Sequence, residues 1–163
     1  MNIEKRIAKA KQDSKGNKRF FHTLKKRRKR EVDTLFHQSH NEVFKELDCL
    51  TCANCCKTTS PIFTRRDIER LSKHLGMTAG MFQAEYLIID EDDDFVLHNA
   101  PCPFLNMEDN KCEVYDHRPK ACREYPHTDR KNMIQILDLT HRNTMVCPAV
   151  QSVVEKIRNH MQT

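Results

Sequence analysis

Glycine is scarce in this chain, with only three among 163 residues. Three motifs that depend on it are missing: G-x-x-x-x-G-K-[ST], G-x-G-x-x-G and G-x-S-x-G. Glycine in these motifs lets the backbone approach a phosphate closely or form the sharp turn that exposes a nucleophilic serine. The sequence therefore argues against P-loop nucleotide sites and Rossmann-type cofactor sites.

Long apolar runs are also missing. Residues 1–18 are charged from Glu4 onward and contain neither the apolar region nor the small-residue cleavage site of a secretory signal. No stretch approaches the roughly 20 apolar residues that a membrane-spanning helix needs. We therefore expect a cytoplasmic protein with no membrane attachment. In that reducing compartment thiols bind metals or carry out chemistry more often than they form disulfides.

Cysteine, in contrast, is plentiful, and half of it lies in one C-x-x-C-x-x-C-C array. Spacings of three residues allow a tight turn to point several thiolates at one centre. Soft sulfur donors select zinc, iron or the irons of an iron-sulfur cluster, whereas hard cations prefer carboxylates. Disulfides within the array would close short, strained loops. The array predicts a zinc or iron site, with these ligands: Cys49, Cys52, Cys55 and Cys56.

Two of these cysteines, Cys55 and Cys56, are adjacent. Side chains of neighbouring residues diverge, so we expect the two thiols to bind different ions or different irons. The array then lies between two centres.

The other cysteines occur singly: Cys102, Cys112, Cys122 and Cys147. The segment 106–110 reads as a turn, which predicts that the first two face each other across a hairpin. Cys147 precedes Pro148 and an amphipathic stripe, at a helix N-cap where the dipole favours thiolate. Eight thiols suffice for two four-thiolate centres, or for one cluster and a smaller site. Each single cysteine also has a plainer interpretation as a small buried hydrophobe.

Charge divides the chain into a basic arm and an acidic body. Residues 1–30 hold thirteen Lys or Arg against two acids, a net charge of +11, whereas the remainder carries about −6. Apolar residues recur at helical spacing from 18 to 47, which predicts one long basic helix. Its run Lys25–Arg30 repels itself unless a polyanion approaches, so RNA or an acidic protein surface is an expected partner of residues 18–30. The alternative is a solvated helix face.

Helix signals dominate the rest of the sequence. Thr64 with Asp67 forms a capping box, Thr78 can cap the next helix, and another helix is expected after Asp129. An acidic turn, 90–94, separates two short strand-like segments and lacks the glycine and final glutamate of an EF-hand. The predicted fold class is mostly α with minor β. We expect a basic helical arm over 1–48 and a small, metal-organised cysteine-cluster domain over 49–163, stabilised by ligation.

Arginines surround one of the single cysteines. Arg118 and Arg123 flank Cys122 and either lower the pKa of its thiol or satisfy local carbonyl groups. His127 is a further candidate ligand, although most histidines of a chain are ordinary surface or core residues.

The cysteine motifs and their context resemble those of the YkgJ-type cysteine-cluster family. The resemblance covers about residues 49–150 and rests on the array, on Cys-Pro-Phe-Leu at 102–105, on the motif that runs from Cys112 to Pro126, and on Cys147-Pro148. It implies chelation of zinc or iron by these cysteines. The family is related to flagellin lysine N-methylases, but nothing in this short chain resembles the larger methylase architecture.

Three functions follow from these features. The first is a metal-binding module whose basic helix contacts an anionic partner. The second is an iron-sulfur or iron enzyme or accessory factor, in methyl transfer or redox maturation. The third is metal storage or delivery. The sequence assigns no catalytic residue.

Overall fold

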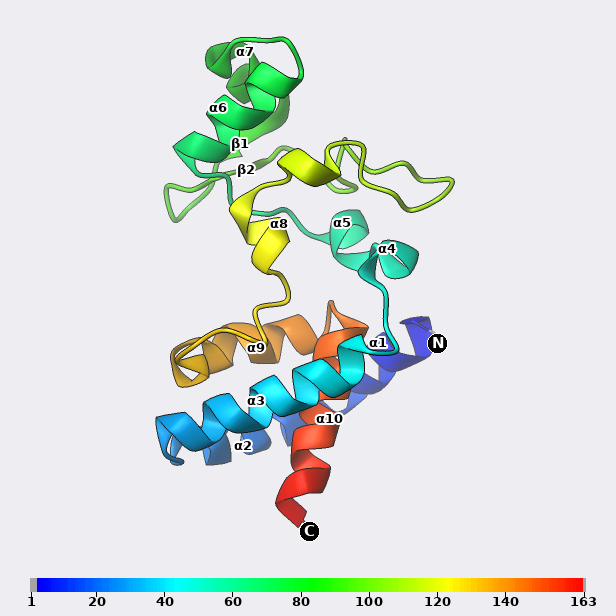
Figure 1. The fold of residues 1–163 in the computed structure, drawn as a ribbon, viewed down its shortest axis with the longest axis vertical. Helices are drawn as coiled ribbons and strands as arrows, with labels where there is room; N and C mark the ends of the chain where they lie inside the picture. Colours follow the sequence, from blue (N-terminus) through cyan, green and yellow to red (C-terminus); the bar gives the residue numbers. More distant parts are fainter. Residues whose placement is uncertain (1–2, 163) are drawn as a thin grey trace. The chain divides into compact units, whose positions relative to one another are not determined.

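The computed structural model describes residues 3–162, which fold as two compact units. The terminal unit combines both ends of the chain, residues 3–48 and 126–162, and the central unit comprises residues 49–125. Both units are mostly helical and the sheet has two strands, which confirms the predicted fold class (Figure 1). Within the described range, no helix has the length and apolar character needed to cross a membrane.

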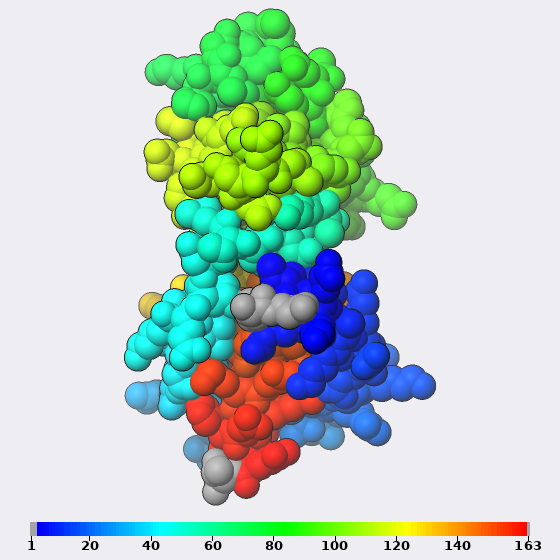
Figure 2. Space-filling model, turned by 90° about the vertical axis from the view of Figure 1, so that its right-hand side faces the viewer, coloured from blue at the N-terminus to red at the C-terminus, as the bar shows by residue number. Residues whose placement is uncertain are grey.

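Helices from the two ends of the chain build the terminal unit. The N-terminal part supplies α1 (Ile3–Gln12), α2 (Ser14–Lys25) and α3 (Lys29–Phe44). The C-terminal part supplies a 3-10 helix, η2 (Met133–Ile136), followed by α9 (Leu137–Thr144) and α10 (Pro148–Gln162). α10 packs against α3, α9 and α1, and α2 packs against α9. In Figure 2 the blue surface of α1 borders the red surface of α10.

The amphipathic stripe predicted after Pro148 forms α10 and faces inward. Four of its apolar members are completely buried, namely Val150, Val153, Val154 and Ile157, and Met161 at the end of the stripe is half-buried. Leu24, Val32 and Phe36 of the N-terminal helices are equally buried within the terminal unit, where α3 packs on α10 and α2 on α9. The helix predicted after Asp129 is also present, with Met133 and Leu137 buried.

The single helix predicted over residues 18–47 is wrong, because the chain turns between α2 and α3. Arg28 has an extended backbone, with φ −67° and ψ 136°, inside the run of like charges. Leu24 before the turn and Val32 after it are both buried, and α2 packs on α9 whereas α3 packs on α10. One straight helix could not pack its first half on α9 and its second half on α10. It would also place the like charges of residues 25–30 on neighbouring turns of a single helix, where they repel each other.

The central unit begins with the cysteine array and continues into a small α/β core. Its elements are α4 (Cys49–Cys52), α5 (Asn54–Thr58), α6 (Arg65–His74), α7 (Ala79–Tyr86), β1 (Leu87–Ile89), β2 (Phe95–Leu97), a 3-10 helix η1 (Tyr115–His117) and α8 (Lys120–Glu124). β1 pairs antiparallel with β2, with Leu87 opposite Leu97. The acidic turn between them is an Asx turn in which Asp90 accepts the N–H groups of Asp92 and Asp94.

The predicted helix ends of the central unit are confirmed. Thr64 and Asp67 form a reciprocal capping box at the start of α6, and Gly76 follows its end with φ +70°. Thr78 accepts the N–H of Met81 at the start of α7. The helices and the hairpin enclose one apolar cluster: Phe63, Ile68, Leu71, Phe82, Leu87, Leu97, Phe104 and Val114.

The unit boundary after Asp48 coincides with the end of the expected arm, whereas residues 126–162 pack with the terminal unit. The physical reason is that the apolar stripe of α10 completes a core with α3, α9 and α1, so the terminal helices share one interior.

Candidate metal centre

The cysteine array consists of two short helices joined by one left-handed residue, rather than of one tight turn. Ala53, between α4 and α5, has φ 47° and ψ 16°, and its N–H bonds to the carbonyl of Cys49 at 3.1 Å. The reversal at Ala53 places Cys55 and Cys56 in the first turn of α5. Backbone geometry therefore separates Cys49 and Cys52 from the adjacent pair.

The two adjacent cysteines interact through their sulfur atoms, which lie 4.0 Å apart. The Cys55 thiol donates a hydrogen bond that lowers the pKa of Cys56 to about 7. Burial opposes the shift, and the nearby Lys57 cation supports it. The lowered pKa of Cys56 favours its thiolate form, which is the form that binds a metal ion.

A hairpin is present between Cys102 and Cys112, but Cys112 lies opposite Leu105 and not, as the sequence predicts, opposite Cys102. Leu105 and Cys112 form an antiparallel bridge, and the N–H of Asn106 bonds to the carbonyl of Lys111 at 2.8 Å. Both thiols are half-buried and pack against the apolar cluster of the central unit. The hairpin thus carries two of the cysteine sulfur atoms within one short segment.

A backbone hydrogen bond joins the array to the hairpin. The N–H of Cys102 donates to the carbonyl of Cys56 at 2.8 Å. Thiols from these two segments and from α8 then lie within electrostatic range of one another: Cys56, Cys102, Cys112 and Cys122. We call these four the central thiol group.

Burial and mutual repulsion keep most of the central thiol group protonated. Burial raises the pKa of Cys122 to about 12, and the sulfurs of the other three members add to the increase. Burial likewise raises the pKa of Cys102 to about 11, helped by Cys56 and Cys112. The pKa of Cys112 is raised for the same reasons, although Arg118 opposes the change. A bound cation would remove this repulsion, so the donor set fits a thiophilic metal ion.

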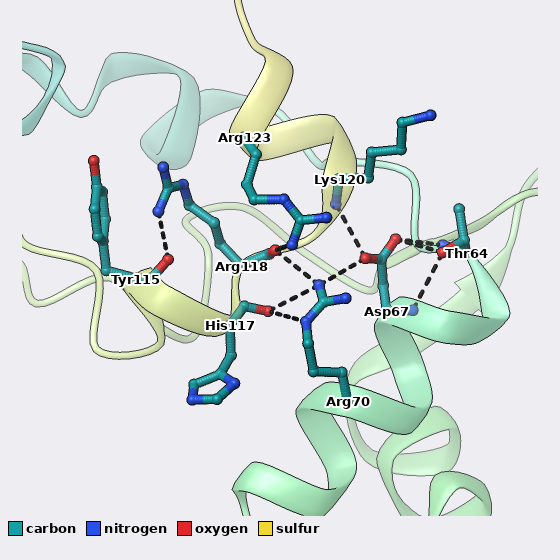
Figure 3. A network of polar contacts seen from close by, with 8 residues as sticks. All are labelled: Thr64, Asp67, Arg70, Tyr115, His117, Arg118, Lys120 and Arg123. Atoms are coloured by element: carbon teal, nitrogen blue, oxygen red, sulfur yellow. Dashed lines mark hydrogen bonds and ion pairs between the residues drawn. The ribbon is translucent and has the colours of Figure 1, made fainter.

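A buried carboxylate fixes the segment that carries Cys122 (Figure 3). Asp67 is 1% exposed and accepts the N–H of Lys120, two residues before the cysteine, at 3.1 Å. Arg70 bonds to Asp67 at 2.7 Å and also donates to the carbonyls of His117 and Arg118. α6 thereby anchors both ends of the bend between η1 and α8.

The arginines beside Cys122 do what both interpretations predicted. Arg118 stacks on the ring of Tyr115, at 3.7 Å from its centre, and donates to the Tyr115 carbonyl at 2.5 Å. Arg123 donates to the Arg118 carbonyl at 3.0 Å. The positive charge of Arg118 also lowers the pKa of Cys112 and of Cys122, against the larger effect of burial. Arg118 therefore supports the bend and favours the thiolates.

The remaining predicted ligands have other positions. Cys49 is exposed and Cys52 is half-buried, in α4, with Cys55 at the start of α5. Cys147 belongs to the terminal unit, where it is buried immediately before α10, as predicted from Pro148. His127 also belongs to that unit and has φ 63°. All eight cysteines are present as thiols and not as disulfides.

The thiols are near one another without already being arranged as ligands. In residues 3–162, no group of three or more His, Cys, Asp or Glu side chains is in a position to hold a metal ion. An ion could be bound by the central thiol group only after its cysteine side chains had turned toward one another.

Sequence reasoning missed the anchoring role of Asp67 and Arg70. The capping box identified Asp67, but only as a partner of Thr64. Its bond to Lys120 spans 53 positions, and no local pattern in the sequence reports such a contact.

Comparison with known families agrees with the cysteine motifs. The profile of one family, described as "CxxCxxCC: Putative zinc- or iron-chelating domain", matches residues 48–148. This range begins just before the array and ends just after Cys147. No solved structure matches the chain. The match supports metal binding in general terms, and the chain belongs to the CxxCxxCC family.

Proposed function

We propose that the central thiol group binds one zinc or iron ion, with Cys56, Cys102, Cys112 and Cys122 as thiolate ligands. The observation that carries the proposal is the convergence of thiols from three separate segments: the array, the hairpin and α8. The thiolate of each member raises the pKa of the others, so the four ionise together only when a cation balances their charge. A cation that binds thiolates gives this arrangement a favourable state.

The family description supports zinc and iron equally, and so does the chemistry of the ligands. Four thiolates form a closed tetrahedral site for zinc, and the same set holds iron. A closed site adds folding free energy, because the ligands are dispersed in the unfolded chain. In a unit of 77 residues with one apolar cluster, that contribution is substantial.

The other cysteines retain their predicted role in the proposal. Cys49, Cys52 and Cys55 bind metal as well, separately from the ion held by the central thiol group, and Cys147 is a candidate ligand within the terminal unit. Cys55 and Cys56 then serve different ions, as their adjacency suggested. The thiols must stay reduced, so the proposed location is the cytoplasm.

An iron-sulfur cluster is the second candidate, and the hydrogen-bonded pair Cys55 and Cys56 favours it. Adjacent thiolates can bind neighbouring irons, and the positive charge of Arg118 would shift the reduction potential of a cluster at this place. Such a cluster would make the protein a redox or methyl-transfer accessory factor. Metal storage or delivery is a third candidate and predicts rapid exchange with a chelator.

Anaerobic purification, elemental analysis and ultraviolet-visible and electron paramagnetic resonance spectra would test the proposal and identify the metal. We expect each of Cys56→Ser, Cys102→Ser, Cys112→Ser and Cys122→Ser to lose the same metal equivalent. Val114→Ala is the matched control, since it removes buried side-chain volume beside Cys112 without removing a donor. It should lower stability and retain the metal. Full metal content in all four serine variants would refute the ligand set.

A further inference from the structure

The segment from 18 to 30 concentrates positive charge to an unusual degree. It contains eight Lys or Arg and no acidic residue. It covers the last eight of the twelve residues of α2, the turn and the first two residues of α3, all in the terminal unit. The turn between the helices bends the basic run around the end of α2, so the charges do not lie along a single helix face.

Only two of these eight cations take part in an ion pair among residues 3–162. Lys25 pairs with Asp138 of α9 at 2.7 Å, and Arg27 pairs with Glu31. The other six are exposed and form no ion pair within the described residues: Lys18, Arg19, Lys26, Arg28, Lys29 and Arg30. A surface that needed only solubility would be expected to mix both signs of charge. In this segment most of the positive charges are not balanced by acidic side chains of the described residues.

A groove lies between α2 and α9 beside this segment. Its walls include Lys18, Arg19, His22 and Lys25 from α2, with Asp138 and His141 from α9. The groove has a volume of about 530 Å³, within the range of small-ligand sites. Cationic side chains and two imidazole rings, together with Phe21 and Thr23, therefore line a space that accommodates one unit of a polymer such as a nucleotide.

In the groove, Lys25 already binds an anionic side chain of the protein, the carboxylate of Asp138. Both carboxylate oxygens of Asp138 accept hydrogen bonds from the ammonium group of Lys25, at 2.7 and 2.8 Å. This hydrogen bond lowers the pKa of Asp138, with help from the charges of Arg142 and His141. Asp138 thus occupies the position of an anionic ligand, and a competing anion would have to displace it from Lys25.

The surroundings of the basic segment distinguish a nucleic acid from a protein. Protein interfaces have an apolar core with aromatic and aliphatic anchors, whereas nucleic-acid interfaces are polar and strongly positive. Within residues 3–30, no large hydrophobic side chain is exposed, and Phe21 and Leu24 are buried. We infer that the groove and the basic segment 18–30 bind the phosphodiester backbone of a nucleic acid, through Lys18, Arg19 and Lys26 among others.

The experiment measures binding of the full-length, metal-containing protein to fluorescein-labelled single-stranded RNA of mixed sequence. Matched single-stranded DNA and duplex DNA identify the preferred form, and polyglutamate competition represents an acidic protein. In about 50 mM salt, the triple variant Lys18→Gln, Arg19→Gln, Lys26→Gln should bind at least about tenfold more weakly than wild type. The slope of log K against log salt should become shallower by about two.

Two further variants make the test specific. A control triple, Lys45→Gln, Arg66→Gln, Lys73→Gln, removes the same charges at exposed positions elsewhere and should change affinity less than about twofold. Asp138→Asn should strengthen binding about twofold to threefold, because Lys25 is released. All variants should retain wild-type metal content, which keeps this result independent of the metal site.

The inference is overturned by any of three results. These are an absence of binding to every nucleic acid at low salt, an equal loss in both triple variants, and displacement of RNA by polyglutamate at equal charge concentration. The last would assign the surface to an acidic protein.

Discussion

The carboxylate of Asp67 joins the start of α6 to the start of α8. One of its oxygens accepts the N–H of Lys120 at 3.1 Å and a guanidinium N–H of Arg70 at 2.7 Å. The other accepts the N–H and the hydroxyl of Thr64, at 3.0 and 2.6 Å. A single buried side chain thereby satisfies four donors and fixes the backbone two residues before Cys122.

Asp67→Asn should therefore destabilise the central unit strongly. The amide keeps the shape of the carboxylate but cannot balance the charge of Arg70, and one of its polar atoms no longer accepts a hydrogen bond. We expect the free energy of unfolding to fall by about 2–4 kcal/mol, and we expect weaker metal binding because the Cys122 segment is released. Urea unfolding and competition with a metal chelator measure the two effects.

The matched control is Asp90→Asn, because Asp90 accepts two backbone N–H groups in an exposed turn. It should cost less than about 1 kcal/mol and leave metal affinity unchanged. Equal effects of the two substitutions would show that Asp67 has no special anchoring role.

Metal removal should loosen the central unit and leave the terminal helices largely intact. Ligation by the central thiol group adds stability only while the ion is bound, by about 4 kcal/mol when free metal exceeds the dissociation constant a thousandfold. After chelator treatment, hydrogen exchange should become faster in α6 and in the 102–112 hairpin. In α3 the exchange rate should increase less or not at all. Restoring Zn²⁺ or Fe²⁺ should reverse the change. Uniform acceleration in both units would contradict this prediction.

A half-buried imidazole, that of His40, makes the terminal unit sensitive to acid. Burial lowers the pKa of His40 below 6.5, against the charge of Asp129 and with help from His37. The unfolded chain then binds a proton near pH 6.5 that the folded unit takes up only at lower pH. We expect stability to be constant above that pH and to fall as the pH decreases from 6.5 toward the folded pKa.

His40→Gln should flatten this dependence, as measured by hydrogen exchange of α3 at pH 7.5 and pH 5. His22→Gln is the control, because His22 is exposed. The prediction fails if both variants show the same slope as the wild type.

A buried amide contributes to the stability of the terminal unit. Asn17 is completely buried, donates to Gln151 at 3.1 Å and accepts from Arg158 at 2.8 Å. Asn17→Ala removes the hydrogen bonds of Gln151 Oε1 and Arg158 Nη2, and we expect the free energy of unfolding to fall by about 2 kcal/mol. Gln38→Ala, at an exposed position of α3, should cost less than about 0.5 kcal/mol in the same thermal unfolding measurement.

Sequence reasoning located much of the fold because local rules determine many of its elements. The Thr64–Asp67 capping box, the Thr78 cap, the hairpin around the acidic turn and the stripe after Pro148 are each encoded within a few residues. Such patterns depend on helix-end chemistry and on periodicity, which need no tertiary information.

The errors arose where distant contacts decide the outcome. The break between α2 and α3 follows from the separate packing of α2 on α9 and of α3 on α10, which lie more than 90 residues downstream in the chain. The sequence predicted eight candidate ligands but not which of them lie near one another. Grouping Cys56 with Cys102, Cys112 and Cys122 required the Cys102–Cys56 backbone contact and the anchoring by Asp67.

Because the terminal unit draws on both ends of the chain, it cannot finish folding during synthesis until the ribosome has released α10. α1, α2 and α3 emerge first, yet the main partner of α3 is translated more than 100 residues later. The central unit is contiguous in the sequence, so it can fold before α1, α2 and α3 have met their C-terminal partners. Nascent chains stalled before residue 148 should consequently depend on chaperones that shield Val32 and Phe36.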